Sequence, residues 1–535
     1  MTVWKRFLGS TDGNMALMTG ALAIPLVLAL GVSIDYSNLA KRASSLQQAV
    51  DSAALAIARE GMTITDAKAR AIAREFVGAN LQDKVRKVTV NRNGYSVRVA
   101  ATVEPDLVFG ELLGTQTWRI ARDAVAEYAP LRYEIAFSLD QTGSMEGAKL
   151  AAMKNAVNSL VDAMSAQVSV KSNLNFAVVP YAAFVNVGPQ YAPDFDETGK
   201  VVKGTGADWL DIYGQVKIDQ HELPANLSRF EVYHALGVKW PGCVETRDPT
   251  KKADHDVMDT APTKSDAGSL FVPTFAIDEP DDRWPGGWPR YPNNYIKSDV
   301  SVLDKTPVGM SLKLAKYGLH KVGGIIERDP ALTVTMDTSP SRFYGNESDP
   351  KGPGYGCEVE PLLPLTSSAA AVKAKVNAIK ANGSTNITEG VMWGWRLLSN
   401  RAPFTEGSAS GARKVLILLT DGANSYGLLN NDLHSGYGSV GYVADGRMDG
   451  VRISSSVDDA RKAMNAKTLA ACTNAKADGI EIYTIRLEVD DSDTGKLLSA
   501  CATDADHYFD SPSAEDLEPV FKQIRDRMTV VRLAS

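Results

Sequence analysis

The stretch IAFSLDQTGSMEG, residues 135–147, decides the fold. Its first half is a run of apolar and aromatic residues, which predicts a buried strand that ends at Asp140. Thr142 and Ser144 follow, and a helix-like segment opens directly after them. A strand that runs through a short polar loop into a helix is typical of parallel α/β sheets, in which ligands bind beyond the carboxyl ends of the strands.

Strand and helix patterns alternate on both sides of a long irregular segment. This segment, at about residues 187–365, is rich in Pro, Gly, Trp and Asp, and it is too long for a plain loop. The sequence therefore predicts an α/β domain over residues 131–535, with a doubly wound, mainly parallel sheet and one large insertion. Strands are expected at 133–140, 174–185, 414–422 and 480–489, and helices at 148–166, 369–383, 388–400, 458–479 and 513–528.

The charge of the chain argues against a general nucleic-acid binder. The 535 residues carry a formal net charge of -7, with 44% hydrophobic and 23% charged residues. Nucleic-acid binding requires clustered Lys and Arg that displace the counterions of phosphates, and no basic stripe is present. The length predicts roughly two to four domains, so the chain can bury a sizeable core.

The N-terminus contains a segment that can cross a membrane. Residues 15–34, MALMTGALAIPLVLALGVSI, carry no charge, and about 20 apolar residues span a bilayer as a helix. Lys5 and Arg6 precede the span, which places residues 1–14 in the cytoplasm and the bulk of the chain outside it. A cleaved signal peptide is the alternative, because small residues at 29–31 resemble a cleavage site.

The helical pattern continues beyond the predicted span, through residues 35–62. An apolar seam runs along one face of this extension, and it can pack either against partner proteins or against the next domain of the chain itself. Residues 63–130 then read as a small α/β domain, with an amphipathic helix, two strands around an Asn93-Gly94 turn and one further strand. The seam consists of Leu39, Ala43, Leu46, Val50, Ala53 and Ile57.

The four cysteines have no CxxC spacing, so a zinc knuckle or a thioredoxin-like site is not expected. Outside the cytoplasm they are most simply two disulfides, for which sequence alone allows three pairings. We favour Cys472 with Cys501, because a helix, a strand and a second helix between them could return the chain. We favour Cys243 with Cys357, because both lie in irregular Gly/Pro-rich sequence.

Oxygen side chains gather at two predicted strand ends and one loop. Asp140 and Asp421 each end a strand, and Thr385 precedes a helix in the segment NGSTNITEG. With Thr142 and Ser144 they form a set of two carboxylates and three hydroxyls, which suits a hard divalent cation such as Mg²⁺ or Mn²⁺. Each aspartate taken alone could instead be a turn or helix-capping residue.

The segments DQTGSM, GSTNITEG and LTDG resemble the three parts of the metal-ion-dependent adhesion site of von Willebrand factor A domains, which have a Rossmann-like fold. The resemblance implies that Asp140, Thr142, Ser144, Thr385 and Asp421 hold the metal, although Thr142 stands where serine is usual. It also implies that a carboxylate of a protein partner completes the coordination of the metal.

The segment from Gly13 to Ala58 and several later stretches, among them WPGC and ACATDADHYFDS, are similar to TadG-like proteins of the Tad/Flp pilus-assembly system. This resemblance implies a single-pass bacterial inner-membrane protein. Its periplasmic or surface-exposed domain would support the assembly or adhesion of tight-adherence pili, and its partners would be the pilin, the envelope or a host surface.

Two other functions remain open. One is a purely structural, pseudopilin-like component of the pilus with a vestigial metal site. The other is a metal-dependent hydrolase with Asp140 as nucleophile, but the second aspartate that such a motif needs is Thr142 here. A Gly-x-Ser-x-Gly elbow is also broken, because Tyr437 replaces the glycine before Ser439. We therefore expect that the protein is not an enzyme.

Overall fold

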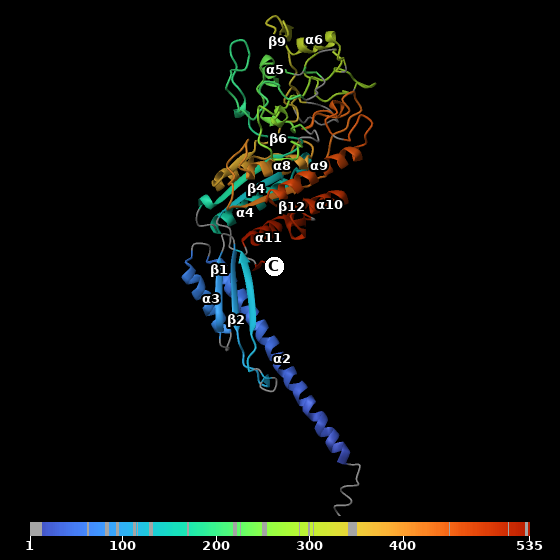
Figure 1. The fold of residues 1–535 in the computed structure, drawn as a ribbon. Helices are drawn as coiled ribbons and strands as arrows, with labels where there is room; N and C mark the ends of the chain where they lie inside the picture. Colours follow the sequence, from blue (N-terminus) through green and yellow to red (C-terminus); the bar gives the residue numbers. More distant parts are fainter. Residues whose placement is uncertain are drawn as a thin grey trace, which may run out of the picture. The chain divides into compact units, whose positions relative to one another are not determined.

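The structure, a computed structural model, divides into two compact units, residues 1–131 with 527–535 and residues 132–526. Figure 1 traces both units along the chain. The expected cytoplasmic N-terminus up to residue 12 and the Asn93-Gly94 turn lie outside the described residues. The structure describes residues 13–60, 64–80, 85–92, 96–110, 114, 116–127, 132–167, 171–217, 222–224, 226–248, 254–287, 289–297, 300–302, 304–340, 350–448, 450–511, 513–529 and 533–534.

The first unit is built on one long helix, α2 (Gly13–Arg59), drawn in blue in Figure 1. From Met18 onward, the described part of α2 is long and apolar enough to cross a membrane. Its N-terminal half leaves large apolar side chains exposed, such as Leu22 at 62% and Ile24 at 67%. The same helix is therefore covered by protein along only part of its length.

The C-terminal half of α2 packs on its own unit, which decides between the two alternatives for the apolar seam. Leu46, Val50 and Ile57 are fully buried in a core shared with α3 and the sheet. The apolar residues recur every three or four positions, so they lie on one face of the helix. The partners in this core are α3 (Asp66–Asn80), β1 (Val85–Arg92), β2 (Ser96–Val103) and β3 (Ile120–Glu127).

The C-terminal end of the chain belongs to this first unit, although sequence reasoning assigned all of residues 131–535 to the later domain. Strand β14 (Leu533–Ala534) pairs antiparallel with β3 and completes a four-stranded sheet in the order β1-β2-β3-β14. A strand of two residues has too little pattern to be recognised in sequence, and its partner lies about four hundred residues earlier in the chain.

The second unit holds a six-stranded sheet in the order β10-β5-β4-β11-β12-β13. Five strands are parallel, and the edge strand β10 runs antiparallel to β5, which sequence reasoning missed. The doubly wound arrangement of helices stays a prediction. The strands are β4 (Tyr133–Asp140), β5 (Leu174–Tyr181), β10 (Leu363–Thr366), β11 (Arg413–Thr420), β12 (Glu481–Leu487) and β13 (Tyr508–Ser511).

Helix α8 (Ile387–Leu398) is buried along its whole length and lies against the central strands. A Cβ at Gly394 would lie 2.3 Å from Leu416 and 2.6 Å from Ser138, so this glycine permits the close approach. Trp393 and Trp395 on this helix are buried in the core. The other helices are α4 (Ala148–Gln167), α7 (Ala369–Ala378), α9 (Val457–Ala477), α10 (Ser492–Cys501) and α11 (Leu517–Thr529).

The insertion has short elements but a buried core that is continuous with the sheet core. Both expected disulfides are confirmed: Cys243 bonds Cys357, and Cys472 bonds Cys501. The first bond ties together parts of the insertion that are 114 residues apart. The insertion contains α5 (Arg229–Ala235), β7 (Cys243–Val244), α6 (Pro307–Lys316), β8 (Leu319–Val322) and β9 (Ile325–Arg328), and β7 pairs with β6 (Val185–Asn186), which directly precedes the insertion.

A buried ion triad fixes the insertion near the carboxyl edge of the sheet. Glu245 is 1% exposed and lies 2.7 Å from both Arg229 and Arg447. Burial alone would raise the pKa of Glu245, but the two guanidinium groups outweigh it and lower the pKa below its usual value. The next residue, Thr246, donates a hydrogen bond to Glu389 on α8.

Candidate functional site

The structure brings together all five side chains of the predicted metal site. Asp140 is the last residue of β4, and Asp421 directly follows β11. Because β4 and β11 are parallel neighbours, their carboxyl ends meet at one edge of the sheet. Thr385 reaches the same edge from the loop before α8, and Thr142 and Ser144 come from the turn after β4.

Asp140 and Thr142 form the buried half of the site. Asp140 has no exposed surface, and its Oδ1 accepts hydrogen bonds from the amide nitrogen of Thr142 at 2.8 Å and from its hydroxyl at 2.6 Å. The hydroxyl of Thr385 donates to Thr142 Oγ1 at 3.3 Å. The local fold is set by the carboxylate, which accepts from the residue two positions on and closes an Asx turn.

Ser144 and Asp421 form the other half, in which Ser144 is exposed and the Asp421 side chain is buried. The Ser144 hydroxyl lies 3.2 Å from Thr142 Oγ1 and donates to Asp421 Oδ1 at 2.6 Å. The second oxygen of Asp421 accepts from the ammonium of Lys149 at 2.8 Å. A row of close hydroxyl oxygens therefore lies between the two carboxylates, with Thr142 donating its hydrogen to Asp140 and Ser144 donating its hydrogen to Asp421, and the row ends on a lysine.

The spacing of these oxygens fits a small hard cation. Neighbouring oxygen ligands of an octahedral Mg²⁺ are about 2.9 Å apart, because each metal–oxygen bond is about 2.1 Å long. The oxygen pairs along the row are 2.6 to 3.3 Å apart. Among the described residues no group of three or more His, Cys, Asp and Glu could hold a metal, so a metal here would depend on the hydroxyls.

Burial and the negative charge of Asp421 raise the pKa of Asp140 from 3.8 to about 6. Hydrogen bonds from Thr142 and Thr420 act in the opposite direction, the latter donating to Asp140 Oδ2 at 2.7 Å. Two like charges thus share a site with little access to water. This arrangement favours the addition of a positive charge.

Sequence reasoning missed two residues of this site. Thr420 immediately precedes Asp421, and its position on the last residue of an apolar strand could have indicated a partner for Asp140. Lys149 stands in the first turn of α4, nine residues after Asp140 in the chain. No motif marks it, and only the fold shows that its ammonium reaches Asp421.

Glycines allow close contacts between the loops at the edge of the site. Gly383 has a φ of +88°, and its carbonyl accepts the amide of Gly143 at 3.1 Å, which joins the two loops. A Cβ at Gly422 would lie 3.1 Å from the Thr385 hydroxyl. A side chain there would therefore press on a proposed ligand.

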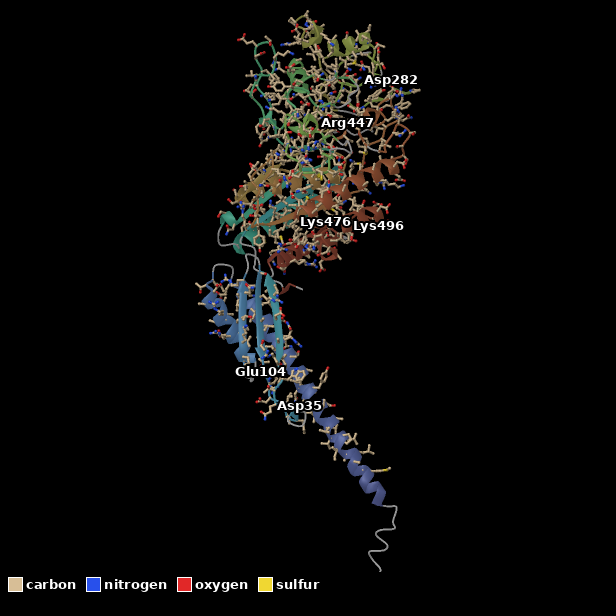
Figure 2. The ribbon with its side chains drawn as sticks, viewed as in Figure 1. Asp35, Glu104, Asp282, Arg447, Lys476 and Lys496 are labelled. Carbon is tan, nitrogen blue, oxygen red and sulfur yellow. A yellow bond between two sulfur atoms is a disulfide. The ribbon has the colours of Figure 1, made fainter. Side chains whose placement is uncertain are left out.

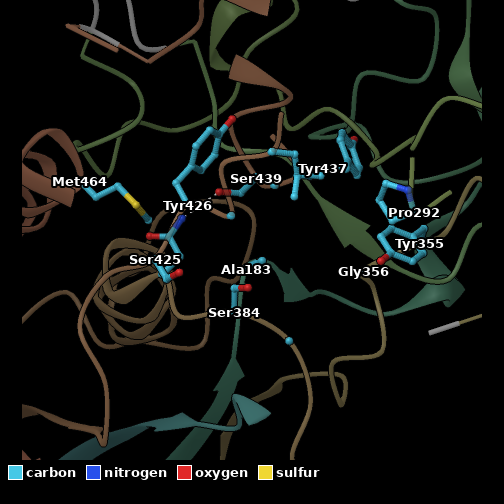
Figure 3. A pocket seen from close by; sticks show the side chains of 16 residues that line it. Ala183, Pro292, Tyr355, Gly356, Ser384, Ser425, Tyr426, Tyr437, Ser439 and Met464 are labelled. Carbon is cyan, nitrogen blue, oxygen red and sulfur yellow. Dashed lines mark hydrogen bonds between the residues drawn. The ribbon is translucent and has the colours of Figure 1, made fainter. Parts of the chain in front are cut away.

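A cavity of about 220 Å³ adjoins the site, and Figure 3 shows its lining. Gly383 and Ser384 line it and directly precede Thr385, and Ser425 lines it from the loop after Asp421. The lining residues carry no formal charge, and tyrosines such as Tyr426 and Tyr437 supply much of the wall. Most of the wall comes from the loops before α8 and after β11, and the insertion adds Pro292, Tyr355 and Gly356.

Comparison with protein families gives one match. Residues 13–60 match the Tad family, described as "Putative Flp pilus-assembly TadE/G-like". This confirms the resemblance of the N-terminal segment to Tad/Flp proteins, over the part of the chain that forms α2. A comparison with curated proteins finds no match.

Several solved structures are similar to the chain at low sequence identity. The pilus adhesin SpaC from Lactobacillus rhamnosus GG is 12% identical, with a TM-score of 0.32, over 83% of this chain and 33% of that one. The vWF domain of the type V pili tip protein Mfa5 from Porphyromonas gingivalis is 11% identical, with a TM-score of 0.32, over 75% and 95%. A von Willebrand factor type A protein from Catenulispora acidiphila is 11% identical, with a TM-score of 0.28, over 84% and 51%. The chain spans about a third of the length of SpaC. Similarity at this level leaves the function to be argued from the residues of the chain itself.

Proposed function

We propose that this chain is an extracytoplasmic protein of tight-adherence (Tad/Flp) pilus assembly or adhesion. The N-terminal half of α2 anchors it in the bacterial inner membrane. It binds a protein partner through a divalent cation, Mg²⁺ or Mn²⁺, held by the five-oxygen site, by which we mean the side chains of Asp140, Thr142, Ser144, Thr385 and Asp421.

The observation that carries the proposal is the convergence of five oxygen side chains from three separate segments. A bound cation would supply an open coordination position for a carboxylate of the partner. The residues of the chain orient that position: Thr420 and Thr142 hold Asp140 in place, and the joined loops at Gly143 and Gly383 fix the turn. The uncharged cavity beside Thr385 would receive the neighbouring part of the partner.

The proposed location of the folded part outside the cytoplasm is supported by α2 and by the cysteines. Residues 13–60 match a pilus-assembly family, and the exposed apolar half of α2 is long enough to span a bilayer. All four cysteines are paired, and disulfides persist in oxidising compartments such as the periplasm. Both features agree with a folded part that lies outside the cytoplasm, in the periplasm or at the surface.

One observation favours the structural alternative, a pseudopilin-like component with a vestigial site. The ammonium of Lys149 lies 2.8 Å from Asp421, so one of the two carboxylates already has a counter-charge without a metal. A hydrolase is less well supported. The Asp140 carboxylate is buried and accepts three hydrogen bonds, which reduce the nucleophilicity of its oxygens.

Calorimetric titration of Mg²⁺ and Mn²⁺ into the full chain in detergent tests the proposal. The parent should bind, and Asp421→Ala should not. Asp493→Asn is the matched control, because Asp493 is an exposed carboxylate on α10 that pairs with Lys496 outside the site. Its cation binding should equal that of the parent.

The variant Lys149→Met separates the two functions. Methionine keeps the length of the side chain and removes its charge, so a cation no longer competes with the ammonium for Asp421. Under the proposal the parent binds the cation and the variant binds it more tightly. If neither protein binds, the five-oxygen site is vestigial and the structural alternative stands.

A further inference from the structure

Within the first unit, one loop is fastened to α2 where the apolar half of the helix ends. Asp35 is the first charged residue after the apolar run, and it is 5% exposed. Its two carboxylate oxygens accept the amide hydrogens of Val108 and Phe109, each at 2.9 Å. Figure 2 labels Asp35 on the helix, below the strands of this unit.

The loop also contacts the helix one turn earlier. A Cβ at Gly31 would lie 2.8 Å from the ring of Phe109, so only a glycine lets the ring pack this closely on the helix. The loop between β2 and β3 is described at residues 104–110, 114 and 116–119, and the Leu107 amide donates a hydrogen bond to the Gln116 carbonyl at 2.9 Å. The hydrogen bonds to Asp35 and the packing of Phe109 on Gly31 therefore fix the position of Val108 and Phe109 along α2.

The exposed described residues of this loop include the polar Asp106, Gln116 and Thr117, and, with the adjacent helix, three large apolar or aromatic side chains. Val108 is 69% exposed, Trp118 is 54% exposed and Tyr36, next to Asp35, is 74% exposed. Arg119 follows Trp118, and its side chain is 75% exposed. Trp and Tyr with nearby Arg are the residues that gather at the headgroup level of a membrane.

The contacts set the depth of the loop relative to a bilayer. Phe109 packs at Gly31, three residues before the end of the apolar run at Ile34, which is about 4.5 Å at 1.5 Å per residue. A bilayer core of about 30 Å takes up all of residues 15–34. The ring therefore lies at the boundary between the acyl chains and the headgroups, on the side of the folded part.

We propose that the described residues of this loop, 104–110, 114 and 116–118, form a collar that docks on the lipid interface around the exit point of α2, with Val108 and Trp118 in contact with lipid and Asp35 as the positioning residue. The occupant is lipid, because the exposed residues are continuous with the exposed apolar surface of α2, which Leu30 at 63% and Ile34 at 47% extend up to the loop. This inference rests on the membrane anchoring in the proposed function.

Photo-crosslinking in the full chain tests the collar. p-Benzoyl-phenylalanine replaces Val108, and the protein is reconstituted in nanodiscs of phosphatidylethanolamine and phosphatidylglycerol. The negative control is Val308, which is 70% exposed and lies on α6 of the insertion. The positive control is Leu22 in the apolar half of α2. We expect lipid adducts by mass spectrometry at 108 and 22 and none at 308.

The pattern of adducts distinguishes the two proposals. Lipid adducts at 22 without any at 108 overturn the collar and leave the anchor intact, and so does an adduct at 108 with protein instead of lipid. No lipid adduct at 22 overturns the anchor and the collar together. In Asp35→Ala the adduct at 108 should be lost and the adduct at 22 kept. Retention at 108 would overturn the positioning role of Asp35.

Discussion

Replacing Asp140 by asparagine should stabilise the metal-free protein and abolish cation binding. The pKa of Asp140 is raised from 3.8 to about 6 by burial and by the charge of Asp421. The folded state therefore holds the Asp140 proton more tightly than the unfolded state does. This difference stabilises the fold fully below pH 3.8, and the stabilisation is lost as the pH rises through about 6. Above that pH the folded protein carries an unfavourable buried charge.

The size of the effect follows from the pKa difference. About 2.2 pKa units at about 1.36 kcal/mol per unit correspond to about 3 kcal/mol. Asparagine removes the charge and keeps the shape. Its amide oxygen can accept from Thr142, and its NH₂ group faces Thr420, whose hydroxyl can turn toward the Gly422 carbonyl at 3.0 Å.

The assay is urea unfolding of the full chain and of Asp140→Asn in chelator at pH 4.0 and pH 7.5. At pH 4.0 the two proteins should unfold at nearly the same urea concentration, because Asp140 of the folded parent is protonated. At pH 7.5 the variant should be more stable by up to about 3 kcal/mol. A variant that is less stable than the parent at pH 7.5, or a stability difference that does not change with pH, would refute the reasoning.

Two further predictions concern the insertion. Glu245→Gln should destabilise the protein by about 3–5 kcal/mol, because Arg229 and Arg447 lose their buried counter-charge. Chemical denaturation measures the change in unfolding free energy, and a change below about 1 kcal/mol would contradict the prediction. Replacing Cys243 and Cys357 by alanine should cost about 4.8 kcal/mol by the chain-entropy relation for a loop of 114 residues, and unchanged unfolding in guanidinium chloride would contradict the role of the bond.

Much of the candidate site could be predicted because its parts are local. Each strand that carries a ligand is a short apolar run with a polar residue at its end, and β4 and β11 are neighbours in a parallel sheet, so Asp140 and Asp421 must meet at one edge. The disulfide pairs could be proposed because Cys243 and Cys357 both lie in irregular Gly/Pro-rich sequence. The helix, strand and helix between Cys472 and Cys501 could bring those two cysteines together. These inferences needed only short-range pattern and one topological rule.

The remaining features depend on contacts between distant parts of the chain. The edge strands β10 and β14 are too short to show a period, and their partners β5 and β3 lie far away in sequence. The insertion is held by disulfides, buried ions and irregular backbone, which leave no repeating pattern. Lys149 is one surface-type residue among many, and its role follows only from the place where α4 begins.

The energetics of the five-oxygen site agree with the proposal that it binds a cation. A sheet edge built only for packing would gain stability from a neutral side chain at Asp140, because the buried carboxylate costs about 3 kcal/mol at neutral pH. The neighbouring residues reduce this cost without removing it: hydroxyls donate to Asp140, and Lys149 compensates Asp421. Such a site is destabilised until a further positive charge arrives, and locally unfavourable residues of this kind are expected where a protein binds its ligand. Cation binding would then stabilise the fold and create the contact point for the partner in one step.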